Sequence, residues 1–150
     1  MKSQIKFLTA AVIASMAFAT ACNNNTDNPD DTTLKGEIPT GTTLTGNITA
    51  NATLTSGSSY KLSGGLHVKA GNTLTIEPGV TVVAVDDDAP DYILIEQGAK
   101  IDAQGTASNP IVMTSELKKS GAWGGIHICG RAHTNAGEGV LSEIGNACLL

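Results

Sequence analysis

Residues 74–82 of the chain read LTIEPGVTV, and 19 positions later residues 93–101 read ILIEQGAKI. The two stretches align without gaps, with apolar residues coinciding at both ends and Gly79 aligned with Gly98. A related half-unit, LHVKAGNTL, occupies residues 66–74. Each unit combines two short alternating runs with a glycine-containing turn, and glycine adopts positive φ at no steric cost. The internal repetition therefore predicts strand–turn–strand units.

The rest of residues 34–150 also alternates between apolar and polar side chains, and this period of two predicts an all-β domain. Short strands that repeat every 19 to 27 residues suit a solenoid, because no single coil can bury its own apolar face. We therefore predict a right-handed parallel β-helix. The alternative is an antiparallel β-sandwich, which is less favoured because the chain lacks the Asn-Gly and Asp-Gly dipeptides that hairpins prefer.

Three longer motifs within residues 66–132 carry a resemblance to a known family. They read LTIEPGVTV, then YILIEQGAKIDAQGTASNPIVMTS, then GAWGGIHICGRA. Their order resembles that of the β-helical surface lipoproteins of Bacteroidetes, although Met113 stands where phenylalanine is usual and Cys129 where a small polar residue is common. The resemblance implies a membrane-anchored cell-surface protein with a structural, adhesive or ligand-binding role and without catalysis.

The C-terminal end departs from that family, whose members usually continue for further coils. Residues 140–150 are largely apolar, whereas a solenoid needs a polar cap on its terminal coil. We therefore expect either a β-helix that is truncated at Leu150 or a second subunit that covers its end.

Residues 1–21 have the layout of a secretory signal peptide, with two lysines before an apolar run at residues 7–18. This run is shorter than the roughly 20 apolar residues that a membrane-spanning helix needs. The following motif, ATAC at residues 19–22, resembles a lipobox. It predicts diacylglycerol on Cys22 and an acyl chain such as palmitate on its new amino group, and several acyl chains anchor a protein stably. The alternative is an ordinary secretory signal with a cysteine near its cleavage site.

Residues 22–33 read CNNNTDNPDDTT and contain no large apolar side chain, so they predict a disordered tether behind the lipid. Their aspartates resemble the signal that sends Bacteroidetes lipoproteins to the outer leaflet, which implies the outer membrane of a Gram-negative bacterium. Thr32 lies in an Asp-Thr-Thr triplet that resembles an O-glycosylation acceptor of the same bacteria. A merely solvated linker is the alternative to both interpretations.

Charge limits the class of partner. Without Lys2 and Lys6 the predicted mature chain keeps 7 basic residues against 14 acidic ones. An acidic chain without a basic patch argues against a nucleic-acid partner. The remaining partners are the membrane, through the lipid anchor, and glycans or surface proteins.

The densest group of carboxylates comprises Asp86, Asp87, Asp88 and Asp91, and Ca²⁺ is bound by such oxygen ligands. The group suggests an alternative function, a calcium-dependent β-helix enzyme of the polysaccharide lyase type or its non-catalytic fragment, with Lys100 or Arg131 as the base. A lengthened, solvated loop explains the same charges without metal. We predict no catalytic residue and no cofactor, with Ca²⁺ as the weaker alternative.

The histidines and cysteines offer no metal motif, because His67, His127 and His133 lack the short local spacing of zinc ligands. His67 and His127 each lie between apolar neighbours and are expected on the outer strand face. Once Cys22 is lipidated, Cys129 and Cys148 remain, and export to an oxidising compartment would let them form a disulfide. A buried free Cys129 is equally compatible with the sequence.

Overall fold

The computed structural model describes residues 33–131, 141–142 and 145–149, and all regular structure in this part of the chain is β-strand. No helix long and apolar enough to span a bilayer occurs among these residues. The strands are β1 (Gly36–Ile38), β2 (Thr43–Ile48), β3 (Ala52–Leu54), β4 (Ser59–Val68), β5 (Thr73–Ile76), β6 (Thr81–Ala84), β7 (Tyr92–Ile95), β8 (Lys100–Ala103), β9 (Val112–Ser115), β10 (Ile126–Ile128), β11 (Leu141–Ser142) and β12 (Gly145–Leu149).

The predicted signal peptide (1–21), the lipidation site Cys22 and the candidate acceptor Thr32 lie outside the described residues. The tether at 22–33 lies outside them too, except for its last residue. These four assignments stay predictions.

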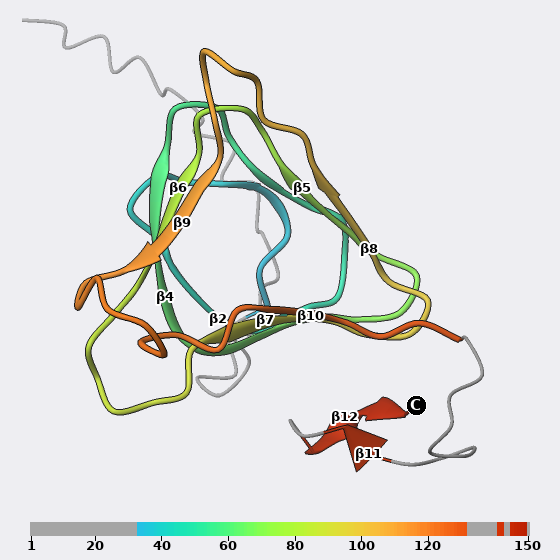
Figure 1. The fold of residues 1–150 in the computed structure, drawn as a ribbon. Coiled ribbons are helices and arrows are strands. Elements are labelled where there is room, and N and C mark those ends of the chain that lie inside the picture. Colours follow the sequence, from blue (N-terminus) through green and yellow to red (C-terminus); the bar gives the residue numbers. More distant parts are fainter. Residues whose placement is uncertain (1–32, 132–140, 143–144, 150) are drawn as a thin grey trace, which may run out of the picture.

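Strands β1 to β10 wind into a coil with three faces (Figure 1). The order β1-β3-β5-β8 makes one face. The long strand β4 contributes to both others, because its first half pairs with β6 and through it β9, while its second half pairs with β7 and through it β10. All pairings among these ten strands are parallel, and only β11 and β12 pair antiparallel.

The coil is right-handed, because the chain in Figure 1 turns counterclockwise as it approaches the viewer. This is the hand that parallel crossover connections almost always adopt. The prediction of an all-β, right-handed parallel β-helix is confirmed, and the antiparallel sandwich is excluded as the architecture of strands β1 to β10.

The strand registers reveal what the sequence repeats mean. Leu74 on β5 lies beside Ile101 on β8, and Leu66 on β4 lies beside Ile93 on β7, in each case 27 positions later. The offset of 19 instead relates two corners of the triangle, β5–turn–β6 and β7–turn–β8. The longer of the two expected spacings is therefore the length of this coil, and the shorter one is a distance between corners.

Glycine makes the tight corners, as the repeats predicted. Gly79 and Gly98 have φ of 80° and 83°, values that other L residues rarely adopt. The corner after Leu62 is different, because β4 passes through it as one strand of 10 residues that bends at Gly64, where φ is 69°. This bend carries one strand across two faces of the coil.

The core fills the inside of the triangle with one inward side chain from every second strand position. These residues are essentially inaccessible: Leu44, Ile48, Leu54, Leu62, Leu66, Val68, Leu74, Val80 and Ile93 have no exposed surface. Tyr60 also points inward, and its hydroxyl donates to the carbonyl of Ile38 at 2.8 Å, which satisfies the polar group of this buried aromatic residue. Functional side chains must therefore come from the outward positions of the same strands.

Candidate functional site

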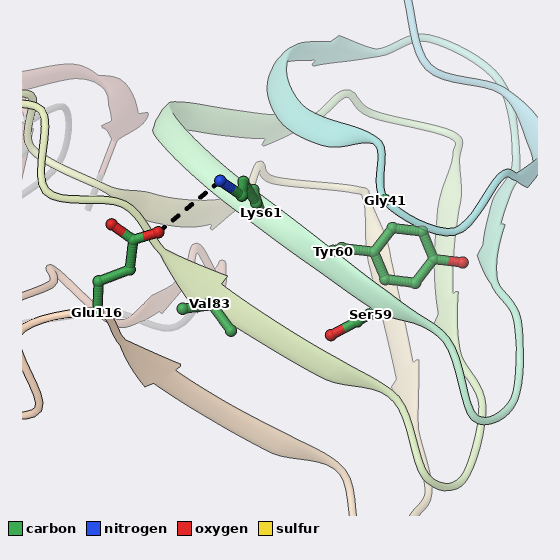
Figure 2. Close-up of a pocket in the computed structure, with 6 residues that line it drawn as sticks. All are labelled: Gly41, Ser59, Tyr60, Lys61, Val83 and Glu116. Atoms are coloured by element: carbon green, nitrogen blue, oxygen red, sulfur yellow. Dashed lines mark ion pairs between the residues drawn. The ribbon is translucent and has the colours of Figure 1, made fainter.

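A shallow hollow of about 240 Å³ lies on the outer face of β4 and β6. Its lining comprises Gly41, Ser59, Tyr60, Lys61, Val83 and Glu116. Figure 2 shows Lys61 and Glu116 reaching toward each other on the side of Val83, while the Tyr60 ring points away from them. The hollow thus has an apolar floor and a charged rim.

The charges on this rim lie 3.8 Å apart, from Lys61 Nζ to Glu116 Oε1. Both side chains are largely exposed, so water screens their attraction, and such pairs contribute at most about 1 kcal/mol. Glu116 Oε2 also accepts a hydrogen bond from the backbone of Asp86 at 3.3 Å. A cation and an anion that solvent can reach are available here to polar ligand groups.

A second group of polar side chains lies on the outer face of β4, β7 and β10. Tyr92 lies between two histidines, with ring centroids 5.6 Å from His67 and 6.0 Å from His127. His67 Nε2 and the Tyr92 hydroxyl form a hydrogen bond of 3.0 Å. His127 Nε2 donates to the carbonyl of Gly124 at 2.9 Å. Both histidines occupy outward strand positions, as the sequence predicted, and both are partly buried.

Glu96 completes this outer cluster. Its Oε1 lies 3.5 Å from His67 Nδ1 and is also paired with Lys69 Nζ. His67 is therefore held at both ring nitrogens, by Tyr92 on one side and by Glu96 on the other. Such a connected network positions side chains more firmly than isolated surface residues.

The sequence interpretation missed Tyr92 and Glu96 as neighbours of His67. The signal that could have found them is the spacing between residues 66–74 and 93–101, which is the coil length of 27. Gly65 pairs with Tyr92 in this register, and a Cβ atom on Gly65 would lie 2.6 Å from the Tyr92 ring. The glycine therefore makes room for the aromatic side chain of the next coil.

The four aspartates proposed as calcium ligands do not form a metal cage. Asp86, Asp87 and Asp88 are exposed in the loop between β6 and β7, whereas Asp91 is buried with 2% of its surface exposed. Within the described part of the chain, no group of three or more His, Cys, Asp or Glu residues is placed to hold a metal ion. The geometry supports the solvated-loop interpretation for this segment.

Two of these aspartates instead bind strand β4. Asp87 accepts hydrogen bonds from Ser63 Oγ at 2.6 Å and from the backbone of Ala89 at 3.1 Å, and the Ser63 bond lowers the pKa of Asp87 from its usual 3.8. Asp91 Oδ1 accepts from the backbone of Gly64 at 2.6 Å. Burial nevertheless raises the pKa of Asp91 above 3.8, because it removes the ionised form from water.

The bases considered for lyase chemistry are not gathered around the aspartates. Lys100 belongs to β8, on the face β1-β3-β5-β8, whereas the aspartate loop joins β6 to β7 on the other two faces. The guanidinium of Arg131 lies near Gly98, at the corner between β7 and β8. His133, the third histidine, lies outside the described residues.

Cys129 follows β10, is 6% exposed and is disulfide-bonded. The side chain of Cys148 lies outside the described residues, although the backbone of β12 runs through this position. The pairing of Cys129 with Cys148 therefore stays a prediction.

These features define a protein class, the parallel β-helices whose outer strand faces carry the polar groups. The comparison with protein families goes one step further, because the model of a pectate-lyase-like β-helix domain matches residues 46–149. The chain belongs to this family. No curated protein and no solved structure gives a significant match to the chain.

Proposed function

We propose that the protein is a lipid-anchored β-helix at the bacterial surface that binds a glycan or a surface protein on its outer strand faces. The observation that supports binding is the hollow over Val83, where an apolar floor adjoins the charged groups of Lys61 and Glu116. Sugar rings present apolar faces and hydroxyl edges, which match an apolar floor with a polar rim. The Bacteroidetes resemblance and the lipobox at residues 19–22 support the anchor and the outer-membrane location.

Binding is tested by measuring association of the purified mature chain with neutral and acidic polysaccharides by calorimetry. We expect a double substitution, Lys61→Ala with Glu116→Ala, to weaken binding at least about tenfold, a loss of about 1.4 kcal/mol. Lys100→Ala is the matched control, because this exposed lysine lies on the face that does not include the hollow. Equal affinity for the wild type and the double variant would remove the hollow as the binding site.

The anchor is tested separately by fractionating cells that express the full precursor. Cys22→Ala should move the protein from the membrane to the soluble envelope or extracellular fraction, since the acyl chains supply the attachment. Membrane retention of this variant would contradict the lipid anchor without affecting the test of glycan binding.

The alternative, polysaccharide cleavage, draws support from the description of the family as pectate-lyase-like. Incubation of the chain with polyuronates, followed by absorbance of unsaturated products, measures this activity. Cleavage that disappears with a chelator and in Asp87→Ala would favour the enzyme over the binding protein.

A further inference from the structure

Leu94 is an apolar residue on the outside of the coil that is nevertheless fully buried. It pairs in register with His67 and His127, and its neighbours Ile93 and Ile95 point inward to the core. Leu94 has no exposed surface and forms a separate apolar cluster with Cys129 and the partly buried Tyr92. An outward leucine reaches zero exposure only where another part of the protein covers it.

The sulfur of Cys129 limits which segment this is. Cys129 is disulfide-bonded, and the chain contains three cysteines, which leaves Cys22 and Cys148 as partners within one molecule. The proposed function uses the Cys22 sulfur for a thioether to lipid. We propose that Cys129 is bonded to Cys148, that this bond holds β12 against the outer face of β7 and β10, and that the segment covers Leu94. The proposal rests on the proposed function, because lipidation is what excludes Cys22.

The end of the coil is consistent with this arrangement. Ile128 on β10 occupies the inward position beside Ile95, yet it is 67% exposed. A further coil stacked on β10 would bury Ile128. Strands β11 and β12 pair antiparallel with each other and take no part in the parallel sheets. The chain thus leaves the coil after β10, and a disulfide one residue beyond that strand fixes the following segment to its side.

The bond forms by a balanced oxidation. Each cysteine thiol loses a proton and an electron, the two sulfurs join, and both electrons reduce an oxidising protein disulfide of the cell envelope to its dithiol. Export supplies this compartment, because cytosolic thiols are kept reduced. The bond would fix the segment beside the cluster of His67, Tyr92 and Glu96, so the oxidised protein presents the hollow over Val83 as its accessible outer face.

Peptide mapping of the purified full chain tests the pairing without any substitution. Trypsin cleaves after lysine and arginine, so the three cysteines fall on separate peptides, residues 22–35, 120–131 and 132–150 of the predicted mature chain. Mass spectrometry without reductant should find residues 120–131 joined to residues 132–150 and lipid on residues 22–35. Reductant should release the two joined peptides.

Two results would overturn the proposal: a free thiol on Cys129, or Cys129 joined to the peptide of residues 22–35. A Cys129–Cys148 link between two chains would also overturn it, and gels without reductant separate such dimers from monomers. A Cys22 without lipid beside an intact intramolecular Cys129–Cys148 link would contradict the proposed anchor and leave the pairing standing.

A second measurement tests whether the bond covers Leu94. Leu94→Ala should shift the unfolding equilibrium at least about 30-fold in the disulfide-bonded protein, as expected for a buried leucine. In a Cys148→Ser background the same substitution should shift it less than about fivefold. Val83→Ala is the matched control, because this outward apolar residue on β6 should respond equally in both backgrounds. An equal cost of Leu94→Ala in both backgrounds would show that the bond does not cover Leu94.

Discussion

The inner and outer surfaces of the β-helix are built from alternate residues of the same strands, yet different forces shape them. On β7 the inward Ile95 is 1% exposed and belongs to the apolar core. Just beyond that strand, the outward Glu96 pairs with Lys69 and His67. The inside gains stability from apolar burial, at roughly 25 cal/mol per Å². The outside can therefore vary its chemistry, and with it the ligand, at little cost to the fold.

Direction alone does not make a residue part of the core. Ile95 and Ile128 are register partners that both point inward, but Ile128 is 67% exposed because it lies at the open end of the described coils. Each coil is buried by the next one, as expected for a solenoid. The comparison between inside and outside thus holds only for coils that are covered on both sides.

Replacing these two isoleucines should give the largest contrast. Ile95→Ala is expected to lower the free energy of unfolding by about 2–5 kcal/mol, the usual cost of removing a fully buried side chain. Ile128→Ala, at the equivalent inward position, should cost less than about 1 kcal/mol because most of its side chain already contacts water. Urea unfolding monitored by circular dichroism measures both. Equal costs would mean that Ile128 is buried in solution.

A smaller effect is expected where the outer face is packed tightly. Gly65→Ala would place a Cβ atom 2.6 Å from the Tyr92 ring, so we expect a loss of about 1–3 kcal/mol from overpacking. The matched control is the same substitution in a Tyr92→Ala background, where the obstructing ring is absent. A penalty that persists there would come from the β4 backbone rather than from the outer cluster.

The strands and tight corners could be predicted from the sequence because their causes are local. Period-two alternation identified Leu74 and Ile76 as the buried side of β5, and glycine marked the corners at Gly79 and Gly98. The coil length was harder to predict, because similar strand–turn–strand corners occur at more than one vertex of the triangle. Sequence similarity alone does not distinguish a corner that repeats around one coil from one that repeats in the next.

The outer cluster depends on contacts between coils, which is why the sequence did not reveal it. His67 and Tyr92 meet only because residues 27 apart are register neighbours after a loop of variable length. The aspartates showed the opposite problem, since nearness in sequence suggested a shared cation. In the fold Asp91 instead turns to the backbone of Gly64, where β4 bends.

Asp91 and Asp87 provide a test that depends on pH. Burial raises the pKa of Asp91, so folding favours its protonated form; this contribution is complete below the unfolded pKa near 3.8 and is lost as pH rises through the folded pKa. The pKa of Asp87 is lowered, so its contribution is present above 3.8 and is lost as pH falls through the folded pKa. The two neighbours should therefore respond in opposite senses.

We expect Asp91→Asn to gain stability relative to the wild type between about pH 3 and pH 7, while Asp87→Asn loses stability over the same interval. Asparagine keeps an oxygen that can accept the Gly64 N–H bond, whereas Asp91→Ala leaves that donor unpaired and should cost about 1–3 kcal/mol at any pH in this range. Chemical unfolding at several pH values measures all three variants. Parallel curves for the two asparagine variants would contradict the opposite pKa directions.

The smallest stability effect is expected at the hollow, where the function is proposed. Lys61→Ala removes an exposed ion pair with Glu116, so the free energy of unfolding should fall by no more than about 1 kcal/mol, and less at high salt. A double-mutant cycle with Glu116→Ala isolates the pair from other contacts of either residue. If the coupling exceeded about 2 kcal/mol, the pair would be part of the framework like the inner core. A small coupling together with loss of ligand affinity would instead place the contribution of these charges in binding, on the outer surface that the fold leaves free.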